Sequence, residues 1–251
     1  MNEFSPLGGA SVVLAARSRS LSRQATAAQW DKEYSRIRSL PSSRSSAPSR
    51  CFAQLDDLLS WPEGFSVLDL GSGAGRHCLH FARKGARVHA LDISSCAIEL
   101  SSRLLEQHGM SMKVKFHHAS VLDPLPRTTG GFDLILDSYM SCHLLDGDER
   151  GRFFVDVHNA LAPDGLFVSL GVSPQDAFYA QYAGATFNGC AYVRDPVSEI
   201  PKILTTESFI EDELRGLFSV VRSGRMPMSD QMDDREYRKE AVYVAARRAT
   251  R

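Results

Sequence analysis

The sequence predicts an α/β fold in which a parallel sheet is covered by helices on both faces. Short apolar runs of strand length recur at 65–70, 86–91, 113–117, 132–137 and 166–170. Stretches with helical spacing of apolar residues alternate with them, at about 75–84, 94–108 and 147–161. Strands and helices that alternate in this way build parallel βαβ units, whose helices pack on the two faces of the sheet.

The first 29 residues contain a single acid, Glu3, while Arg17, Arg19 and Arg23 lie among serines and alanines. We interpret residues 1–29 as a flexible tail. An organellar transit peptide is the alternative, because such segments are rich in Arg and Ser and poor in acids. The main domain is expected over residues 30–251, with helical segments at about 27–37 and 51–59.

A glycine-rich turn follows the first predicted strand, in the sequence Asp69-Leu70-Gly71-Ser72-Gly73-Ala74-Gly75. Three glycines in five residues allow positive φ angles and a close approach of the backbone to a ligand. A dinucleotide-binding fingerprint needs a small residue where this chain has Arg76, and a phosphate-binding P-loop needs Lys-Ser/Thr where it has Arg76-His77. A plain tight turn between strand and helix remains the structural alternative.

A second acid, Asp92, ends the second predicted strand and lies 21 residues after Gly71. An acid at this place in a nucleotide-binding α/β fold hydrogen-bonds ribose hydroxyls. Asp92 or Ser94 could instead cap the following helix.

The acid-x-Gly-x-Gly-x-Gly motif together with Asp92 resembles the class I S-adenosylmethionine-dependent methyltransferases, in their small-molecule, tellurite-resistance and thiopurine-like branch. The resemblance implies a Rossmann-like, seven-stranded, mostly parallel sheet. Its last strand, at 241–246, would lie antiparallel between the fifth strand and the sixth, at 218–223. A helix is expected at 206–217 and a polar loop at 224–236.

The resemblance also implies the activity, which is transfer of the methyl group of S-adenosylmethionine to a small-molecule acceptor. Two alternatives stay open. One is an enzyme of the same fold that cyclises or cleaves S-adenosylmethionine, and the other is a non-catalytic subunit that binds it.

The cofactor-binding residues implied by the resemblance lie in the glycine turn and at the ends of the second to fourth strands. They are Asp69, Gly71, Ser72, Gly73, Gly75, Asp92, Ile93, Ser120, Val121 and Asp137. The chain departs from the family at Ala119-Ser120-Val121, where Gly-Asp-Ala is usual and the acid binds the adenine amino group. Asp123 is a candidate substitute for that acid.

Two residues after the fourth strand are candidates for catalysis. His143 is a candidate general base, because an unperturbed histidine titrates near neutrality. Tyr139 could orient the substrate or face the sulfonium as a cation–π partner. A structural role for His143 is the alternative.

Candidate acceptor-binding residues come from three segments, and they are Trp30, Tyr34, Ser138, Tyr179 and Tyr182. Trp30 and Tyr34 belong to a Trp-Asp-x-x-Tyr lead-in that packs over the cofactor pocket in similar enzymes, although they could simply be buried helix residues. Tyr179 and Tyr182 lie in an aromatic-rich insertion near 172–205, which we expect to cover the acceptor. An ordinary packed insertion is the alternative.

Composition excludes several classes of function. The net charge is -1, so no basic excess points to nucleic acid. Five scattered cysteines show no zinc spacing and indicate reduced thiols, so no metal is expected. No apolar run approaches the length of a membrane span. We therefore expect a cytoplasmic monomer or homodimer whose partner is a small molecule.

Overall fold

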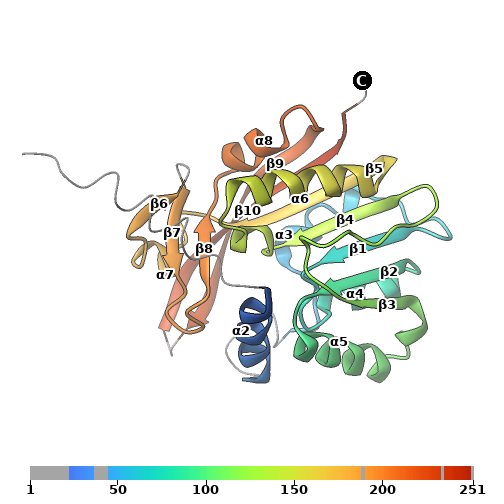
Figure 1. Ribbon diagram of the computed structural model, residues 1–251, viewed down its shortest axis with the longest axis horizontal. Helices are drawn as coiled ribbons and strands as arrows, with labels where there is room; N and C mark the ends of the chain where they lie inside the picture. Colours follow the sequence, from blue (N-terminus) through green and yellow to red (C-terminus); the bar gives the residue numbers. More distant parts are fainter. Residues whose placement is uncertain (1–22, 37–44, 188–189, 233–234, 250–251) are drawn as a thin grey trace, which may run out of the picture.

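A computed structural model describes residues 23–36, 45–187, 190–232 and 235–249 (Figure 1). Seven strands form one sheet in the order β3-β2-β1-β4-β5-β10-β9. In chain order they are β1 (Ser66–Leu70), β2 (Arg87–Asp92), β3 (Val114–His118), β4 (Phe132–Ser138), β5 (Leu161–Val172), β9 (Phe218–Met232) and β10 (Arg235–Arg248).

The pairing of these strands matches the predicted topology. β1 pairs in parallel with β2 and β4, and β3 and β5 extend the sheet in parallel on either side. β10 runs antiparallel to both of its neighbours, β5 and β9. The predicted seven-stranded fold with an antiparallel last strand is therefore confirmed. The strand order reverses between β1 and β4, which is where such sheets bind ligands at their carboxyl ends.

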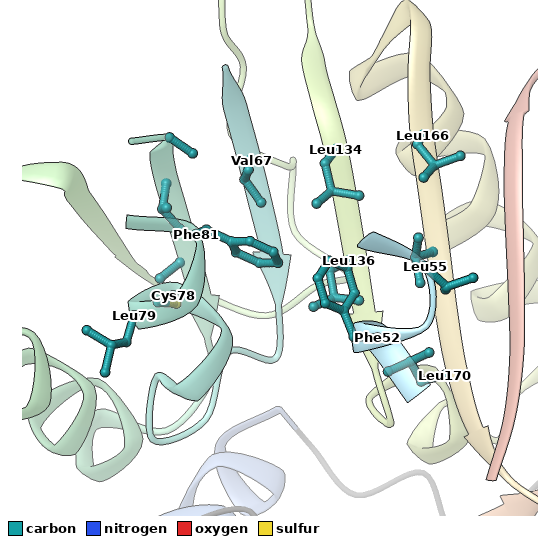
Figure 2. Close-up of a cluster of buried hydrophobic side chains, with 14 of the residues drawn as sticks. Phe52, Leu55, Val67, Cys78, Leu79, Phe81, Leu134, Leu136, Leu166 and Leu170 are labelled. Atoms are coloured by element: carbon teal, nitrogen blue, oxygen red, sulfur yellow. The ribbon is translucent and has the colours of Figure 1, made fainter. Parts of the chain in front are cut away.

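Helices cover both faces of the sheet, and the apolar residues of the strands are the reason that both faces are buried. On one face α3 (Arg50–Ala53), α4 (Arg76–Arg83) and α5 (Ser95–Gln107) pack on a cluster that includes Val67, Leu134 and Leu136. Figure 2 shows Phe52 and Phe81 against these strand residues. On the other face α6 (Gly147–Ala160) and α8 (Glu207–Leu214) cover Leu68 and Ile135. Successive strand residues point to opposite faces, so apolar residues at every position give two buried faces.

The predictions at both ends of the chain need correction. α2 (Arg23–Ser35) begins seven residues before residue 30, so 23–29 are helical rather than part of a tail; the predicted tail at 1–22 lies outside the described residues. The predicted helix at 51–59 is the short α3 followed by a 3-10 turn, η2 (Asp56–Leu58). The predicted polar loop at 224–236 is wrong, because β9 and β10 extend through most of it as a long hairpin.

The insertion near 172–205 has regular structure of its own. It contains α7 (Ala177–Ala180) and a three-stranded antiparallel sheet of β6 (Ala185–Phe187), β7 (Cys190–Arg194) and β8 (Pro201–Leu204). It is joined to the main sheet where Thr205 N donates to Val172 O, at 2.8 Å. In Figure 1, α2 lies between this insertion and α5.

Candidate functional site

The glycine turn between β1 and α4 adopts the conformation that its sequence predicts. Gly71, Gly73 and Gly75 have φ angles of 66°, 55° and 87°. A Cβ on Gly71 would lie 2.6 Å from Met140 Cγ, and one on Gly73 would lie 2.6 Å from the Tyr34 hydroxyl. Glycine is therefore needed at both positions for conformation and for space.

Asp69 lies in β1 immediately before the turn, and its side chain is completely buried. Cys78 Sγ donates to Asp69 Oδ2 at 3.2 Å, while Oδ1 has no partner within the described chain. Burial raises the pKa of Asp69 to about 7. The Ser72 hydroxyl in the turn is also buried without a partner in the described residues. Unsatisfied buried groups are rare, and a ligand at the turn would satisfy them.

Asp92 connects the end of β2 to the glycine turn. Its Oδ2 accepts from Gly73 N and its Oδ1 accepts from Ser94 N, each at 2.8 Å. Burial raises the pKa of Asp92 to about 6, although the hydrogen bonds from these amides oppose the shift. The cap of α5 is Ser94, whose hydroxyl accepts from Ala97 N at 3.1 Å. Asp92 therefore supports the glycine turn and places a carboxylate at the carboxyl end of the sheet.

Asp31 attaches α2 to this site, a role that the sequence analysis did not assign to it. Its Oδ1 accepts from the Ser94 hydroxyl at 2.7 Å and from Cys96 N at 3.1 Å, at the first turn of α5. Burial opposes its charge, but these hydrogen bonds lower the pKa of Asp31. The contact holds Tyr34 over Gly73 and holds the Trp30 ring perpendicular to His143, with 4.9 Å between ring centroids.

The end of β4 forms a tight turn around Asp137. Its Oδ1 accepts from Met140 N and Ser141 N at 3.1 and 3.0 Å, and its Oδ2 accepts from Ser169 Oγ at 2.9 Å. Both oxygens of Asp137 thus have partners within the protein and hold the turn in place, and a contact between Asp137 and the cofactor stays a prediction. Tyr139 inside this turn has a φ of 61°, which is rare for a residue other than glycine and common at functional sites. The neighbouring Ser138 hydroxyl is buried without a partner in the described residues.

His143 lies in η4 (Ser141–His143) and contacts the insertion. Its Nδ1 lies 2.8 Å from Pro201 O, so Nδ1 carries the hydrogen and Nε2 keeps the lone pair of a neutral ring. Burial and the charge of Lys202 lower the pKa of His143 to about 3. A histidine of such low basicity is neutral at physiological pH and is a weak general base.

The insertion holds a buried triad of Tyr179, Asp195 and Lys202, which we call the lysine triad. Lys202 Nζ donates to Asp195 Oδ2 at 2.9 Å and to the Tyr179 hydroxyl at 3.0 Å. The Tyr179 hydroxyl donates to the same Asp195 oxygen at 2.9 Å. The predicted acceptor contact through this hydroxyl is therefore not supported, because the triad uses it. Tyr182 is 44% exposed and is open to a ligand.

The segment expected to hold the adenine forms a compact turn. Ser120 N donates to Asp123 Oδ2 at 3.0 Å, and Ser120 Oγ accepts from Leu122 N at 3.2 Å. Val121 is buried, and Ile93 O lies 3.1 Å from His118 Nε2. Asp123 also forms an ion pair with Arg23 at the start of α2, so it supports the turn and is not free to replace the missing family acid.

The described residues contain neither a cluster of metal-ligating side chains nor a membrane-spanning helix. No group of three or more His, Cys, Asp or Glu side chains there could hold a metal ion. None of the helices that the structure describes is long and apolar enough to cross a membrane.

The sequence matches known methyltransferases over its central part. A family model described as "Methyltransferase domain" matches residues 67–165. The ajmaline N-methyltransferase of Rauvolfia serpentina is 34% identical over 109 residues, which are 43% of this chain and 36% of that protein. A ubiquinone biosynthesis O-methyltransferase of Maricaulis maris is 26% identical over 106 residues, which are 42% of this chain and 40% of that protein. The chain thus spans less than half the length of these curated relatives.

The fold is shared more widely than the sequence. The Burkholderia thailandensis 1,6-didemethyltoxoflavin-N1-methyltransferase, solved with 1,6-didemethyltoxoflavin and S-adenosylhomocysteine, superposes with a TM-score of 0.65 at 21% identity. The match covers 99% of this chain and 94% of that one. These matches agree with the glycine turn, with the acids at the ends of two strands and with the order of the strands in the sheet. Residues 67–165 therefore match a methyltransferase domain, and the chain has the fold of this solved methyltransferase.

Proposed function

We propose that this protein transfers the methyl group of S-adenosylmethionine to a small-molecule acceptor. The observation that carries the proposal is a pair of buried polar atoms, Asp69 Oδ1 and Ser72 Oγ, that have no partner among the described residues. They lie beside a glycine turn at the switch point of the sheet. The similar proteins named above are N- and O-methyltransferases. They support the class of reaction and leave the acceptor atom open.

Some residues of this chain bind the cofactor, and others enclose the site. S-adenosylmethionine, when bound, supplies a methyl group that its sulfonium already activates. The Asp92 carboxylate is placed to accept from ribose hydroxyls, as in other folds of this kind. Trp30, Tyr34 and the insertion enclose the carboxyl end of the sheet and exclude water. The main catalytic contribution is alignment of the acceptor with the methyl group.

The role of His143 follows from its environment. Its Nε2 lone pair is available, but its low pKa limits it to weak proton acceptance. This supports an acceptor that is already nucleophilic at neutral pH, such as an uncharged amine or a thiolate, which needs no base. We retain Tyr139 and Ser138 as acceptor-facing residues, because both lie at the end of β4.

The test is turnover of S-adenosylmethionine with a panel of amine, thiol, phenol and carbon acceptors, with product analysis by mass spectrometry. Methyl transfer releases S-adenosylhomocysteine and adds 14 mass units to an acceptor. Release of methylthioadenosine would instead identify a cyclising or cleaving enzyme. Tight binding without turnover across the panel would favour a non-catalytic binding subunit, and absence of binding by calorimetry would refute the proposal.

We further propose a small-molecule partner, a monomeric or homodimeric state and a cytoplasmic location, with an organellar location as the alternative. The near-neutral charge supports a small-molecule acceptor rather than nucleic acid. A monomer or homodimer is testable by light scattering. Imaging of the full chain and of a chain lacking residues 1–22 distinguishes cytoplasmic from organellar targeting.

A further inference from the structure

His143, just after β4, keeps one ring nitrogen free for a ligand. Its Nδ1 lies 2.8 Å from Pro201 O, and this carbonyl is the only hydrogen-bond partner of the ring among the described residues. A carbonyl can only accept, so Nδ1 holds the hydrogen and Nε2 is left as an acceptor. The Trp30 ring of α2 packs edge-on against the imidazole. The ring therefore has one fixed nitrogen and one open nitrogen.

The carbonyl that fixes the ring of His143 comes from a tightly held turn between β7 and β8. The buried Asp195 organises this turn, because its Oδ1 accepts from two backbone amides of the turn at 3.0 Å each. The backbone N of Asp195 also donates to Ile200 O at 3.1 Å. Glu199 in the same turn has a φ of 60°, a conformation that persists only where the surrounding structure imposes it. The turn thus delivers Pro201, the first residue of β8, in one position.

The lysine triad holds the same turn from inside the insertion. Lys202 follows Pro201 directly, and its Nζ donates to Asp195 Oδ2 at 2.9 Å. Asp195 therefore uses one oxygen for the turn and the other for the triad. β8 also packs on η4 through Ile203 and Cys142. A buried ion pair is weak evidence for stability, whereas fixing one arrangement of the chain is a role that such pairs can have.

The charges around His143 favour an uncharged acceptor molecule. Burial and the charge of Lys202 lower the pKa of His143, and Asp195 opposes them more weakly. The same two factors disfavour an ammonium group bound at Nε2. A thiolate has no hydrogen to donate to Nε2. An uncharged amine has both a lone pair for the methyl group and an N–H group for the ring nitrogen.

We propose that Asp195 and Lys202 are positioning residues that hold Pro201 O against His143 Nδ1, so that Nε2 accepts a hydrogen bond from the N–H group of an uncharged amine acceptor. This inference rests on the proposed function and narrows its acceptor to one chemical class. The ring orients the amine and does not take its proton. The lysine triad acts only through the Pro201 carbonyl.

The first test measures the tautomer of His143 without any ligand, by 15N NMR of the full chain labelled at histidine. The signals that are absent from His143→Gln identify the residue, and wild type should show a protonated Nδ1 and an unprotonated Nε2. Asp195→Asn keeps an acceptor oxygen for the turn but loses the charge that Lys202 binds. It should shift the tautomer ratio toward protonated Nε2 by about fivefold, the size of one lost hydrogen bond.

A milder variant and a matched control accompany this measurement. Tyr179→Phe removes one hydrogen bond to each of the other triad members and should shift the ratio in the same direction by less. It decides the test if Asp195→Asn does not fold. Tyr237→Phe makes the same change in the same apolar cluster, where the Tyr237 hydroxyl has no hydrogen-bond partner in the described chain, and should leave the ratio unchanged. A wild-type ratio in the folded triad variants overturns the inference.

The second test uses N-methylaniline and N,N-dimethylaniline as acceptors, which are both uncharged at neutral pH and differ in the N–H group. Wild type should prefer N-methylaniline in kcat/KM, and this preference should fall about fivefold in Asp195→Asn and persist in Tyr237→Phe. The fall should lie in KM for the amine, with KM for S-adenosylmethionine changed by less than about twofold.

Two outcomes of the second test overturn the acceptor class. They are a preference that is the same in Asp195→Asn as in wild type, and a panel of acceptors in which no amine is methylated. Absence of S-adenosylmethionine binding by calorimetry refutes the proposed function instead. The tautomer measurement needs no ligand, so the two failures are distinguishable.

Discussion

Asp69 gives a prediction in which stability and cofactor affinity change in opposite directions. The carboxyl group is completely buried, one of its oxygens has no partner in the described chain, and its pKa is raised to about 7. A folded-state pKa above the unfolded value of 3.8 means that the native state binds the proton more tightly. Asp69 therefore lowers the stability of the unliganded protein as pH rises from about 4 to 7.

The size of this effect follows from the shift. About 3 pKa units at about 1.4 kcal/mol each make the ionised carboxylate cost about 4 kcal/mol above pH 7. Asp69→Asn removes the charge, but its amide N–H group is left unpaired where Oδ1 has no partner, at a cost of about 1–3 kcal/mol. The net gain is about 2 kcal/mol, which corresponds to about 4–8 °C in Tm for a chain of this size.

The assay is thermal unfolding of both proteins without ligand at pH 8 and pH 5, with calorimetric titration of S-adenosylmethionine at pH 8. Asp69→Asn should raise Tm at pH 8 and bind S-adenosylmethionine at least about tenfold more weakly, since a charged acceptor is lost. The gain in Tm should disappear at pH 5, where the wild-type carboxyl is mostly protonated. A fall in Tm at pH 8 that equals or exceeds the fall at pH 5 would show that ionisation of the carboxyl does not destabilise the fold, and it would refute the reasoning.

Four further predictions follow from the site. Asp92→Ala leaves two buried amides unpaired and should cost about 2–5 kcal/mol of unfolding free energy by denaturant titration, as well as most of the S-adenosylmethionine affinity by calorimetry. Asp31→Ala removes a helix-end acceptor and should cost about 1 kcal/mol, with faster backbone hydrogen exchange in α2 and unchanged exchange in α6. His143→Gln should keep the shape of the pH–rate profile above about pH 5, because the pKa of the ring is about 3; a lost limb there would establish a base role. Lys202→Met should cost about 3–5 kcal/mol of unfolding free energy, because the buried Asp195 loses its only ion-pair partner among the described residues, and adding Asp195→Asn should recover part of it; no recovery would contradict the triad.

The sequence alone determined the sheet and the cofactor end of the site. The run that contains Val67 and Leu68 is apolar at successive positions and of strand length, which predicts a strand buried on both faces, and the two side chains do lie on opposite faces. The glycine turn and the acid 21 residues beyond Gly71 are local features whose spacing matches one βαβ unit. The start of α8 was equally local, since Thr206 accepts from Phe209 N at 3.2 Å as a helix cap.

The tertiary structure decided the features that depend on contacts between distant parts of the chain. Asp31 contacts residues of α5 that lie 63 or more positions away in the sequence, and His143 contacts Pro201, which lies 58 positions away. No local sequence pattern therefore predicts either contact. The hairpin of β9 and β10 was hidden because β9 is an edge strand, whose polar residues resemble those of a loop. Residue type shows that Asp69 and Arg76 carry charge. Only packing shows that Asp69 Oδ1 is buried without a partner among the described residues, because burial and pairing are properties of the assembled fold.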